Sequence, residues 1–123
     1  MHTKKKVLII EDDYDTSDLL GFETKQLKLR VVNTSDILPV SAIEEMSPDL
    51  IITDHYVNGK LGGDFCLALK SNLLTHKIPV ILLSAATGLA QIASDCHADA
   101  FLEKPFNLSE LENLINTFLQ PVI

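Results

Sequence analysis

Asp49-Leu50-Ile51-Ile52-Thr53-Asp54 is the stretch of this 123-residue chain that most clearly indicates its fold. Three consecutive aliphatic residues are followed at once by polar ones, and a short apolar run without alternation is typical of a parallel strand covered on both faces. Similar runs lie at 7–10 and 80–83, and weaker ones at 29–32 and 100–102. We therefore predict five strands, most of them buried on both faces.

Segments with helical character separate these runs. The predicted helices are at 14–27, 39–47, 64–75, 88–95 and 107–119. The last is the clearest, because its leucines recur at helical spacing and because Asn107 with Glu110 resembles a capped helix start. Strands that alternate with helices predict an α/β fold, a doubly wound parallel sheet covered on both faces.

The composition indicates one globular domain and limits its partners. Hydrophobic residues make up 46% of the chain, which suits a packed core. A net charge of −7 argues against a nucleic-acid partner, because phosphate contacts need clustered Lys and Arg. No apolar run is long enough for a membrane span or a signal peptide, so we expect no membrane partner and a cytoplasmic protein. Cys66 and Cys96 lack ligand spacing and are interpreted as reduced core thiols.

Polar residues gather directly after the apolar runs. The first run ends in Glu11-Asp12-Asp13, the third in Thr53-Asp54, the fourth in Ser84 and the fifth in Glu103-Lys104. In doubly wound sheets, sites form outside the carboxyl ends of the strands. We therefore predict that these side chains meet at one edge of the sheet.

This combination of groups fits phosphoryl transfer. Neighbouring carboxylates repel one another unless a cation is present, and oxygen-rich acidic sites suit Mg²⁺. A lysine and a hydroxyl opposite them would hold the oxygens of a tetrahedral anion. A carboxylate can itself be the nucleophile. Spacing alone does not identify that carboxylate, and it does not separate this site from a Mg²⁺-dependent phosphatase.

Four motifs resemble, in order, those of response-regulator receiver domains of two-component signalling. They are VLIIEDD at 7–13, DLIITD at 49–54, IPVILLSA at 78–85 and ADAFLEKPF at 98–106. The resemblance spans nearly the whole chain. It implies a flavodoxin-like fold of five parallel strands in the order 2-1-3-4-5. It also implies a sensor histidine kinase or a histidine phosphotransfer protein as phosphoryl donor, and a signalling domain that catalyses only its own phosphorylation and slow dephosphorylation.

The resemblance assigns an acceptor and a metal site. Asp54 matches the phosphoacceptor and also contacts the metal. Glu11 and Asp12 match the acidic pair that holds Mg²⁺, Asp12 directly and Glu11 through water. Tyr56 would offer the metal its backbone carbonyl. Asp13 falls just past the pair and is interpreted as a neighbouring polar residue or a helix cap.

The resemblance also assigns the groups that respond to phosphorylation. Lys104 would pair with the phosphoryl group, and Ser84 would hydrogen-bond one of its oxygens beside the Ala85 amide. Phe101 matches an aromatic switch position whose rotamer follows Ser84. The surface around the fourth helix, fifth strand and fifth helix would then change.

Two regions depart from the family pattern. Asn58 stands where a proline is common, and the segment 55–63 is longer than usual with three glycines, which suggests a mobile loop. The interval from Ser84 to Lys104 is shorter than in many receivers, so we expect a short fourth helix. His55, beside the acceptor, is interpreted as a structural or exposed histidine.

The sequence leaves the wider context open. We expect a single receiver domain over 1–123 without an output domain, either a stand-alone regulator, a relay intermediate or a receiver from a longer protein. Other hypotheses are a Mg²⁺-dependent small-molecule phosphatase and a degenerate receiver that only binds partners. A flavodoxin-like cofactor binder is disfavoured, because acids at 11–13 would repel a cofactor phosphate.

Overall fold

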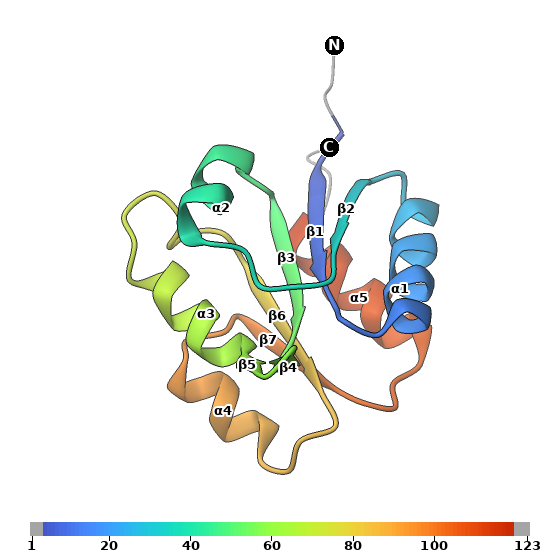
Figure 1. Cartoon of the computed structure of the whole chain (residues 1–123). Helices are drawn as coiled ribbons and strands as arrows, with labels where there is room; N and C mark the ends of the chain where they lie inside the picture. The colour runs from blue at the N-terminus through green and yellow to red at the C-terminus, as the bar shows by residue number, and fades with distance from the viewer. Residues whose placement is uncertain (1–3, 120–123) are drawn as a thin grey trace.

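A five-stranded parallel sheet forms the centre of the computed structural model, which describes residues 4–119 (Figure 1). Its strands are β1 (Lys6–Ile10), β2 (Arg30–Thr34), β3 (Leu50–Asp54), β6 (Val80–Ser84) and β7 (Ala100–Glu103). They are hydrogen-bonded in the order β2-β1-β3-β6-β7. Counted along this sheet alone, that is the order 2-1-3-4-5, so the predicted fold is confirmed.

Helices cover both faces of the sheet, as Figure 1 shows. On one face lie α1 (Tyr14–Gln26) and α5 (Leu108–Leu119), and on the other lie α2 (Val40–Met46), α3 (Gly62–Lys70) and α4 (Leu89–Asp95). Successive strand residues point to opposite faces. Val7 and Ile9 therefore belong to the core beneath α1 and α5, whereas Leu8 and Ile10 belong to the other core. Burial on both sides explains why these strands read as unbroken apolar runs.

Two predicted helix starts are capped as the sequence indicates. At α1, the Asp13 carboxylate accepts hydrogen bonds from the Thr16 hydroxyl and, at 2.9 Å, from the Thr16 amide. These two bonds lower the pKa of Asp13, and the bond from the amide confirms it as the cap. At α5, the Asn107 side chain accepts from the Glu110 amide at 2.9 Å, and the Glu110 carboxylate accepts from the Asn107 amide. This reciprocal pair satisfies two backbone donors that the helix leaves free.

The third helix differs from the prediction of 64–75, because α3 begins at Gly62 and ends at Lys70. Beyond it, the Asn72 side chain accepts a hydrogen bond from the Leu74 amide at 2.8 Å. Asparagine side chains compete with helical hydrogen bonds in this way. The buried Thr75 hydroxyl also donates to the Leu69 carbonyl, which closes the chain back onto the helix end. The fourth helix has seven residues, so the expectation of a short one is confirmed.

The segment after Asp54, expected from its glycines to be a mobile loop, forms a hairpin. Strands β4 (Tyr56–Val57) and β5 (Lys60–Leu61) pair antiparallel across Asn58 and Gly59. Asn58 has a φ of 50° and Gly59 a φ of 77°. Two consecutive positive φ values are typical of the two-residue turn that matches the twist of a hairpin. The glycine therefore serves a defined turn.

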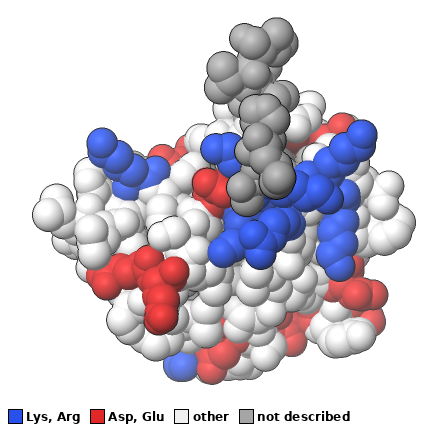
Figure 2. Space-filling model, turned by 90° about the horizontal axis from the view of Figure 1, so that it is seen from above, with Lys and Arg blue, Asp and Glu red and all other residues white. Residues whose placement is uncertain are grey.

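The two ends of the sheet differ in charge. Seen from the amino ends of the strands, Lys and Arg side chains gather on the surface (Figure 2). Lys5 and Arg30 are neighbours there, since the Arg30 amide donates to the Lys5 carbonyl at 2.9 Å. Glu11, Asp12 and Asp54 lie at or just beyond the carboxyl ends of β1 and β3, at the opposite end of the sheet. In the described part of the chain, no helix is long and apolar enough to cross a membrane.

The interior also holds both thiols. Cys66 and Cys96 are buried and unpaired within residues 4–119, as the sequence predicts. Burial, with Cys96 close by, raises the pKa of Cys66 to about 12. Thiols of this kind are unreactive, because the thiolate is the nucleophile.

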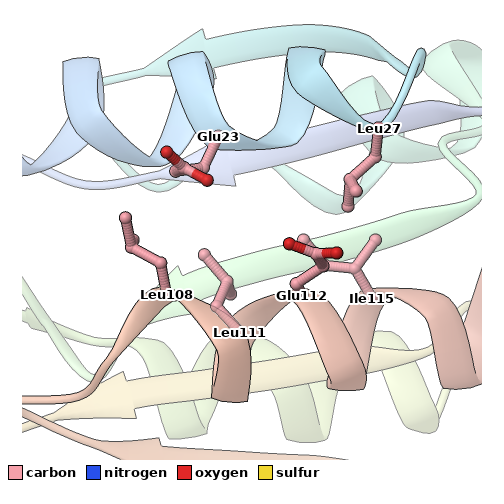
Figure 3. Close-up of a pocket in the computed structure, with 6 residues that line it drawn as sticks. All are labelled: Glu23, Leu27, Leu108, Leu111, Glu112 and Ile115. Atoms are coloured by element: carbon pink, nitrogen blue, oxygen red, sulfur yellow. The ribbon is translucent and has the colours of Figure 1, made fainter.

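A narrow gap lies between α1 and α5 (Figure 3). Leu108 and Leu111 point from α5 toward α1, with Glu23 opposite them, and Leu27 lies opposite Glu112 and Ile115. The space has no room for a water molecule. It contains no nucleophile or metal-ligand cluster, and we interpret it as imperfect packing between two helices.

Candidate phosphoacceptor site

Lys104 joins two carboxylates at the carboxyl edge of the sheet. Its Nζ lies 2.6 Å from Asp54 Oδ2 and 3.0 Å from Glu11 Oε2. Glu11 is 2% exposed and Asp54 8% exposed, whereas the Lys104 side chain is 24% exposed. Glu11 and Lys104 are 93 positions apart in the sequence. Together with Asp54 they form a half-buried ionic cluster that opens toward solvent on the lysine side.

The register of the parallel strands brings these residues together. Asp54 at the end of β3 lies opposite Leu83 in β6, and Ser84 lies opposite Glu103 in β7. The Lys104 amide then donates to the Ser84 carbonyl at 2.9 Å, which continues the ladder past the strand end. The predicted meeting of the polar strand ends is therefore confirmed for Glu11, Asp54, Ser84 and Lys104.

The electrostatics of the cluster show a shortage of positive charge. Burial raises the pKa of Glu11, and the Asp54 carboxylate adds to that increase despite hydrogen bonds from the Asp13 amide and Lys104. Burial alone would lower the pKa of Lys104, but its hydrogen bonds to Asp54 and Glu11 outweigh burial and raise it. Lys104 therefore stays protonated at neutral pH and is the internal counterion of the two acids.

The Asp54 carboxylate is held from two sides. Oδ2 accepts from Lys104, and Oδ1 accepts a longer hydrogen bond of 3.3 Å from the Tyr56 amide. Because a carboxylate oxygen has two lone pairs, Oδ1 retains the capacity to bind or attack an electrophile. Tyr56 itself is 55% exposed, and its ring packs edge-on against His55 at 4.7 Å between ring centroids.

Asp12 is exposed and is not part of the Lys104 cluster. Its Oδ2 accepts a hydrogen bond from the Asn58 amide at 2.9 Å, so the hairpin holds this carboxylate. Within residues 4–119, no three His, Cys, Asp or Glu side chains are grouped closely enough to hold a metal ion. Lys104 bridges Glu11 and Asp54, whereas the Asp12 carboxylate accepts its hydrogen bond from the hairpin.

The donor set nevertheless fits Mg²⁺ in its chemistry. All three candidate side chains offer carboxylate oxygens, and Mg²⁺ commonly takes one or two carboxylates and completes its shell with water and phosphate oxygens. Three acids with one ammonium, and a pKa of Glu11 raised by burial, describe a site that an added cation would stabilise.

The residues predicted to respond to phosphorylation are Ser84, Ala85 and Phe101. Ser84 is 3% exposed, and its hydroxyl accepts a hydrogen bond from the Ala86 amide at 3.0 Å. Ala85 beside it is exposed. Phe101 is 38% exposed and pairs with Leu82 across the β6–β7 ladder, so it points to the same face of the sheet as Ser84.

His55 has a structural role that the sequence only partly indicated. It is buried, and its Nδ1 accepts a hydrogen bond from the Gly63 amide at 3.1 Å, while its carbonyl accepts from the Gly62 amide. A Cβ on Gly62 would lie 2.1 Å from the Asp54 carbonyl oxygen, and one on Gly63 would lie 2.9 Å from the His55 ring. Only glycine allows α3 to begin this close to the acceptor. No local sequence signal predicted this packing.

Comparison with known families identifies the class of protein. The family model of the response regulator receiver domain matches residues 7–116. The chain therefore belongs to the response regulator receiver domain family, which confirms the resemblance seen in its motifs.

Particular relatives agree with this assignment. The chain is 28% identical over 126 aligned residues to the phosphate regulon transcriptional regulatory protein PhoB of Klebsiella pneumoniae, covering 96% of this chain and 53% of that protein. The chain thus spans about half the length of this curated relative.

Solved structures share the fold. One is the chemotaxis protein CheY4 of Vibrio cholerae, with a TM-score of 0.84 and 21% identity over 95% of this chain and all of that one. Another is the receiver domain of the sensor histidine kinase PA1611 of Pseudomonas aeruginosa, described with a magnesium ion coordinated in its active-site cleft. It has a TM-score of 0.85 and 20% identity, over 97% of this chain and 100% of that chain.

Proposed function

We propose that this domain accepts a phosphoryl group on Asp54 from a phosphohistidine of a sensor histidine kinase or a histidine phosphotransfer protein. The observation that carries the proposal is the cluster of Asp54, Glu11 and Lys104, in which the buried Asp54 carboxylate has one oxygen fixed by an ammonium and the other only weakly held. Membership in the receiver family supports the same role.

The side chains divide the work of the transfer. Asp54 Oδ1 attacks phosphorus in line, a new O–P bond forms, and the P–N bond to the donor imidazole breaks. The imidazole leaves with the bonding electron pair and takes a proton. Lys104 then exchanges part of its contact with Asp54 Oδ2 for a phosphoryl oxygen, because its ammonium has three donors. A bound Mg²⁺ would supply further neutralisation of the phosphoryl charge.

Glu11, Asp12, Asp54 and the Tyr56 carbonyl are the groups we assign to that Mg²⁺. Asp12 and Asp54 would contact the ion, and Glu11 would reach it through water. Glu11 contacts Lys104, so a cation that replaces this ammonium near Glu11 would free Lys104 for the phosphoryl group.

Ser84 and Phe101 would transmit phosphorylation of Asp54 to the surface of the domain. The Ser84 hydroxyl, which now accepts from the Ala86 amide, would donate to a phosphoryl oxygen beside the Ala85 amide. Phe101, on the same face, would then move into the space that Ser84 leaves. This change would alter the surface of α4, β7 and α5, where a partner detects it.

Intact-mass spectrometry tests the proposal. The protein is incubated with acetyl phosphate and MgCl₂, alongside Asp54→Asn and a sample treated with a chelator. We expect one added phosphoryl group in the wild type and none in either control. An adduct that persists in Asp54→Asn would refute the assignment of the acceptor, and no adduct with any donor would indicate a degenerate receiver.

Turnover separates the proposal from a phosphatase. A receiver forms and slowly hydrolyses one aspartyl phosphate per cycle, whereas a Mg²⁺-dependent phosphatase releases phosphate from small phosphoesters over many rapid cycles. Release of inorganic phosphate from p-nitrophenyl phosphate at enzymatic rates would contradict the receiver assignment.

A further inference from the structure

The hairpin after Asp54 is tied to the rest of the protein at three points. The Asn58 amide donates to Asp12 Oδ2 at 2.9 Å, and the Asn58 side-chain nitrogen donates to the Ser35 carbonyl at 2.7 Å. Lys60 Nζ lies 3.3 Å from Asp36, next to Ser35 in the connection between β2 and α2. The hairpin thus spans from the acidic pair to the neighbouring connection.

One residue makes the two contacts nearest the site. Asn58 binds Asp12 through its backbone and Ser35 through its side chain, so the side-chain contact fixes the position of the backbone donor. In residues 4–119, this amide is the one hydrogen-bond donor to the Asp12 carboxylate. Asp12 is otherwise exposed, and an exposed aspartate without a partner samples several rotamers.

The usual proline of the family would not serve at this position. Proline has no amide hydrogen, and its ring fixes φ near −65°, whereas Asn58 has a φ of 50°. Asparagine tolerates this left-handed conformation and precedes Gly59 in the turn. In this chain, the segment is a hydrogen-bonded hairpin that needs the amide and the positive φ of Asn58.

We propose that Asn58 is a positioning residue for Asp12: its amide fixes the Asp12 carboxylate, and its side chain anchors the hairpin to the Ser35 carbonyl, so that Asp12 is oriented in advance for Mg²⁺. One Asp12 oxygen accepts from the hairpin and the other stays free. Hydrogen bonds that orient ligating carboxylates commonly change metal affinity by about 10–100-fold. The inference rests on the proposed function, because it assigns Asp12 to Mg²⁺.

The test compares two variants of the same hairpin. Asn58→Gly keeps the amide and the positive φ but removes the anchor to Ser35. Lys60→Gln removes the exposed contact with Asp36, which does not involve Asp12. The binding of MgCl₂ to each full-length protein is measured by titration calorimetry and by amide chemical shifts. We expect Asn58→Gly to bind Mg²⁺ about tenfold more weakly, and Lys60→Gln to bind as the wild type does.

A spectroscopic measurement separates positioning from general stability. In the wild type, we expect a scalar coupling across the hydrogen bond between the Asn58 amide nitrogen and Asp12 Cγ, and its weakening in Asn58→Gly. If Asn58→Gly does not fold, Gly59→Ala is used, because a Cβ there meets no atom within 4 Å and only the turn is strained. It should also weaken Mg²⁺ binding.

The outcomes are distinct. Wild-type affinity in a folded Asn58→Gly or Gly59→Ala, or an equal loss in Lys60→Gln, would overturn the positioning role while leaving the proposed function intact. A wild-type protein that binds no Mg²⁺ would overturn both the positioning role and the metal site. Phosphorylation of Asp54, measured separately by mass, would show whether the acceptor assignment survives.

Discussion

Lys104 links the stability of this domain to its chemistry at the level of a single side chain. Its ammonium neutralises Glu11 and Asp54, two carboxylates that the sheet brings together. The same ammonium is the group we assign to the incoming phosphoryl group. Its contacts with Glu11 and Asp54 therefore hold the site together before phosphoryl transfer.

Lys104→Met should destabilise the protein in a pH-dependent way. We expect a loss of about 1.5–3 kcal/mol at neutral pH, the usual value of hydrogen bonds to charged groups. Glu11 has a raised pKa in the folded protein, so its ionisation costs stability as the pH rises above 4.5. Without Lys104, the ionisation of Glu11 destabilises the folded protein further. The stability lost in Lys104→Met should therefore shrink as the pH falls toward 4.5.

Urea unfolding at several pH values checks this prediction, with Lys60→Met as the control. Lys60 makes an exposed ion pair with Asp36, which should contribute little to stability because water and salt screen both charges. Equal losses in the two variants, or a loss for Lys104→Met that does not change with pH, would contradict the role of Lys104 as counterion.

The thiols should be inert in the folded protein. The pKa of Cys66 is about 12 in the folded protein, against an ordinary 9.0, so folding favours the protonated thiol. The stability that this preference contributes is complete below pH 9.0 and is lost as the pH rises toward 12. We expect iodoacetamide to modify neither Cys66 nor Cys96 at neutral pH, and both in urea. Rapid modification of the native protein, read by mass, would show that the thiols are accessible.

At the scale of elements, the junction between β3 and α3 depends on one close approach. The Gly62 amide donates to the His55 carbonyl, and its Cα lies against the Asp54 backbone. The acceptor is thus fixed from behind by the start of α3. A side chain at this position would push the helix away from the strand.

Gly62→Ala should therefore destabilise the protein far more than Gly59→Ala. A Cβ on Gly62 would meet the Asp54 carbonyl at 2.1 Å, and we expect a loss of more than about 3 kcal/mol. Gly59→Ala strains only a left-handed turn in open space and should cost about 1 kcal/mol. Thermal unfolding of both variants measures the difference, and comparable midpoints would refute the close approach.

Local sequence patterns predict the strands and most helices well, but not the end of α3 or the hairpin. Strands and most helices follow from local patterns, and their positions agree with the structure within about two residues. The end of α3 was missed, because a single Asn72 side chain competes with helical hydrogen bonds. Asn58-Gly59 is a strong hairpin signal, but the three glycines of the segment 55–63 favour the prediction of a mobile loop, which does not include the hairpin.

At the scale of the whole molecule, the site is an outcome of sheet order. Residues at the ends of the four neighbouring strands β1, β3, β6 and β7 met as predicted, because parallel strands end at one edge. The contact of Asp12 did not follow from strand order, since its hydrogen bond to Asn58 spans 46 positions and no local pattern encodes it. The packing of His55 against α3 was not predictable for the same reason.

Phosphorylation should change one side of the molecule. We expect amide hydrogen exchange to change in the segment 84–104, which includes α4 and β7, and to stay constant in β1 and β2. Ser84→Ala should keep the phosphoryl group but lose most of this change, because the proposed switch begins at its hydroxyl. A phosphorylated Ser84→Ala with the wild-type exchange pattern would contradict the switch.

The most direct test of the central claim is to trap the modified residue itself. Borohydride reduces an aspartyl phosphate to homoserine, and tandem mass spectrometry of the digested protein then locates that homoserine. The account predicts homoserine at position 54, with Glu11 and Asp12 unchanged. Homoserine at another position, or a phosphoryl group that borohydride does not convert, would show that Asp54 is not the acceptor.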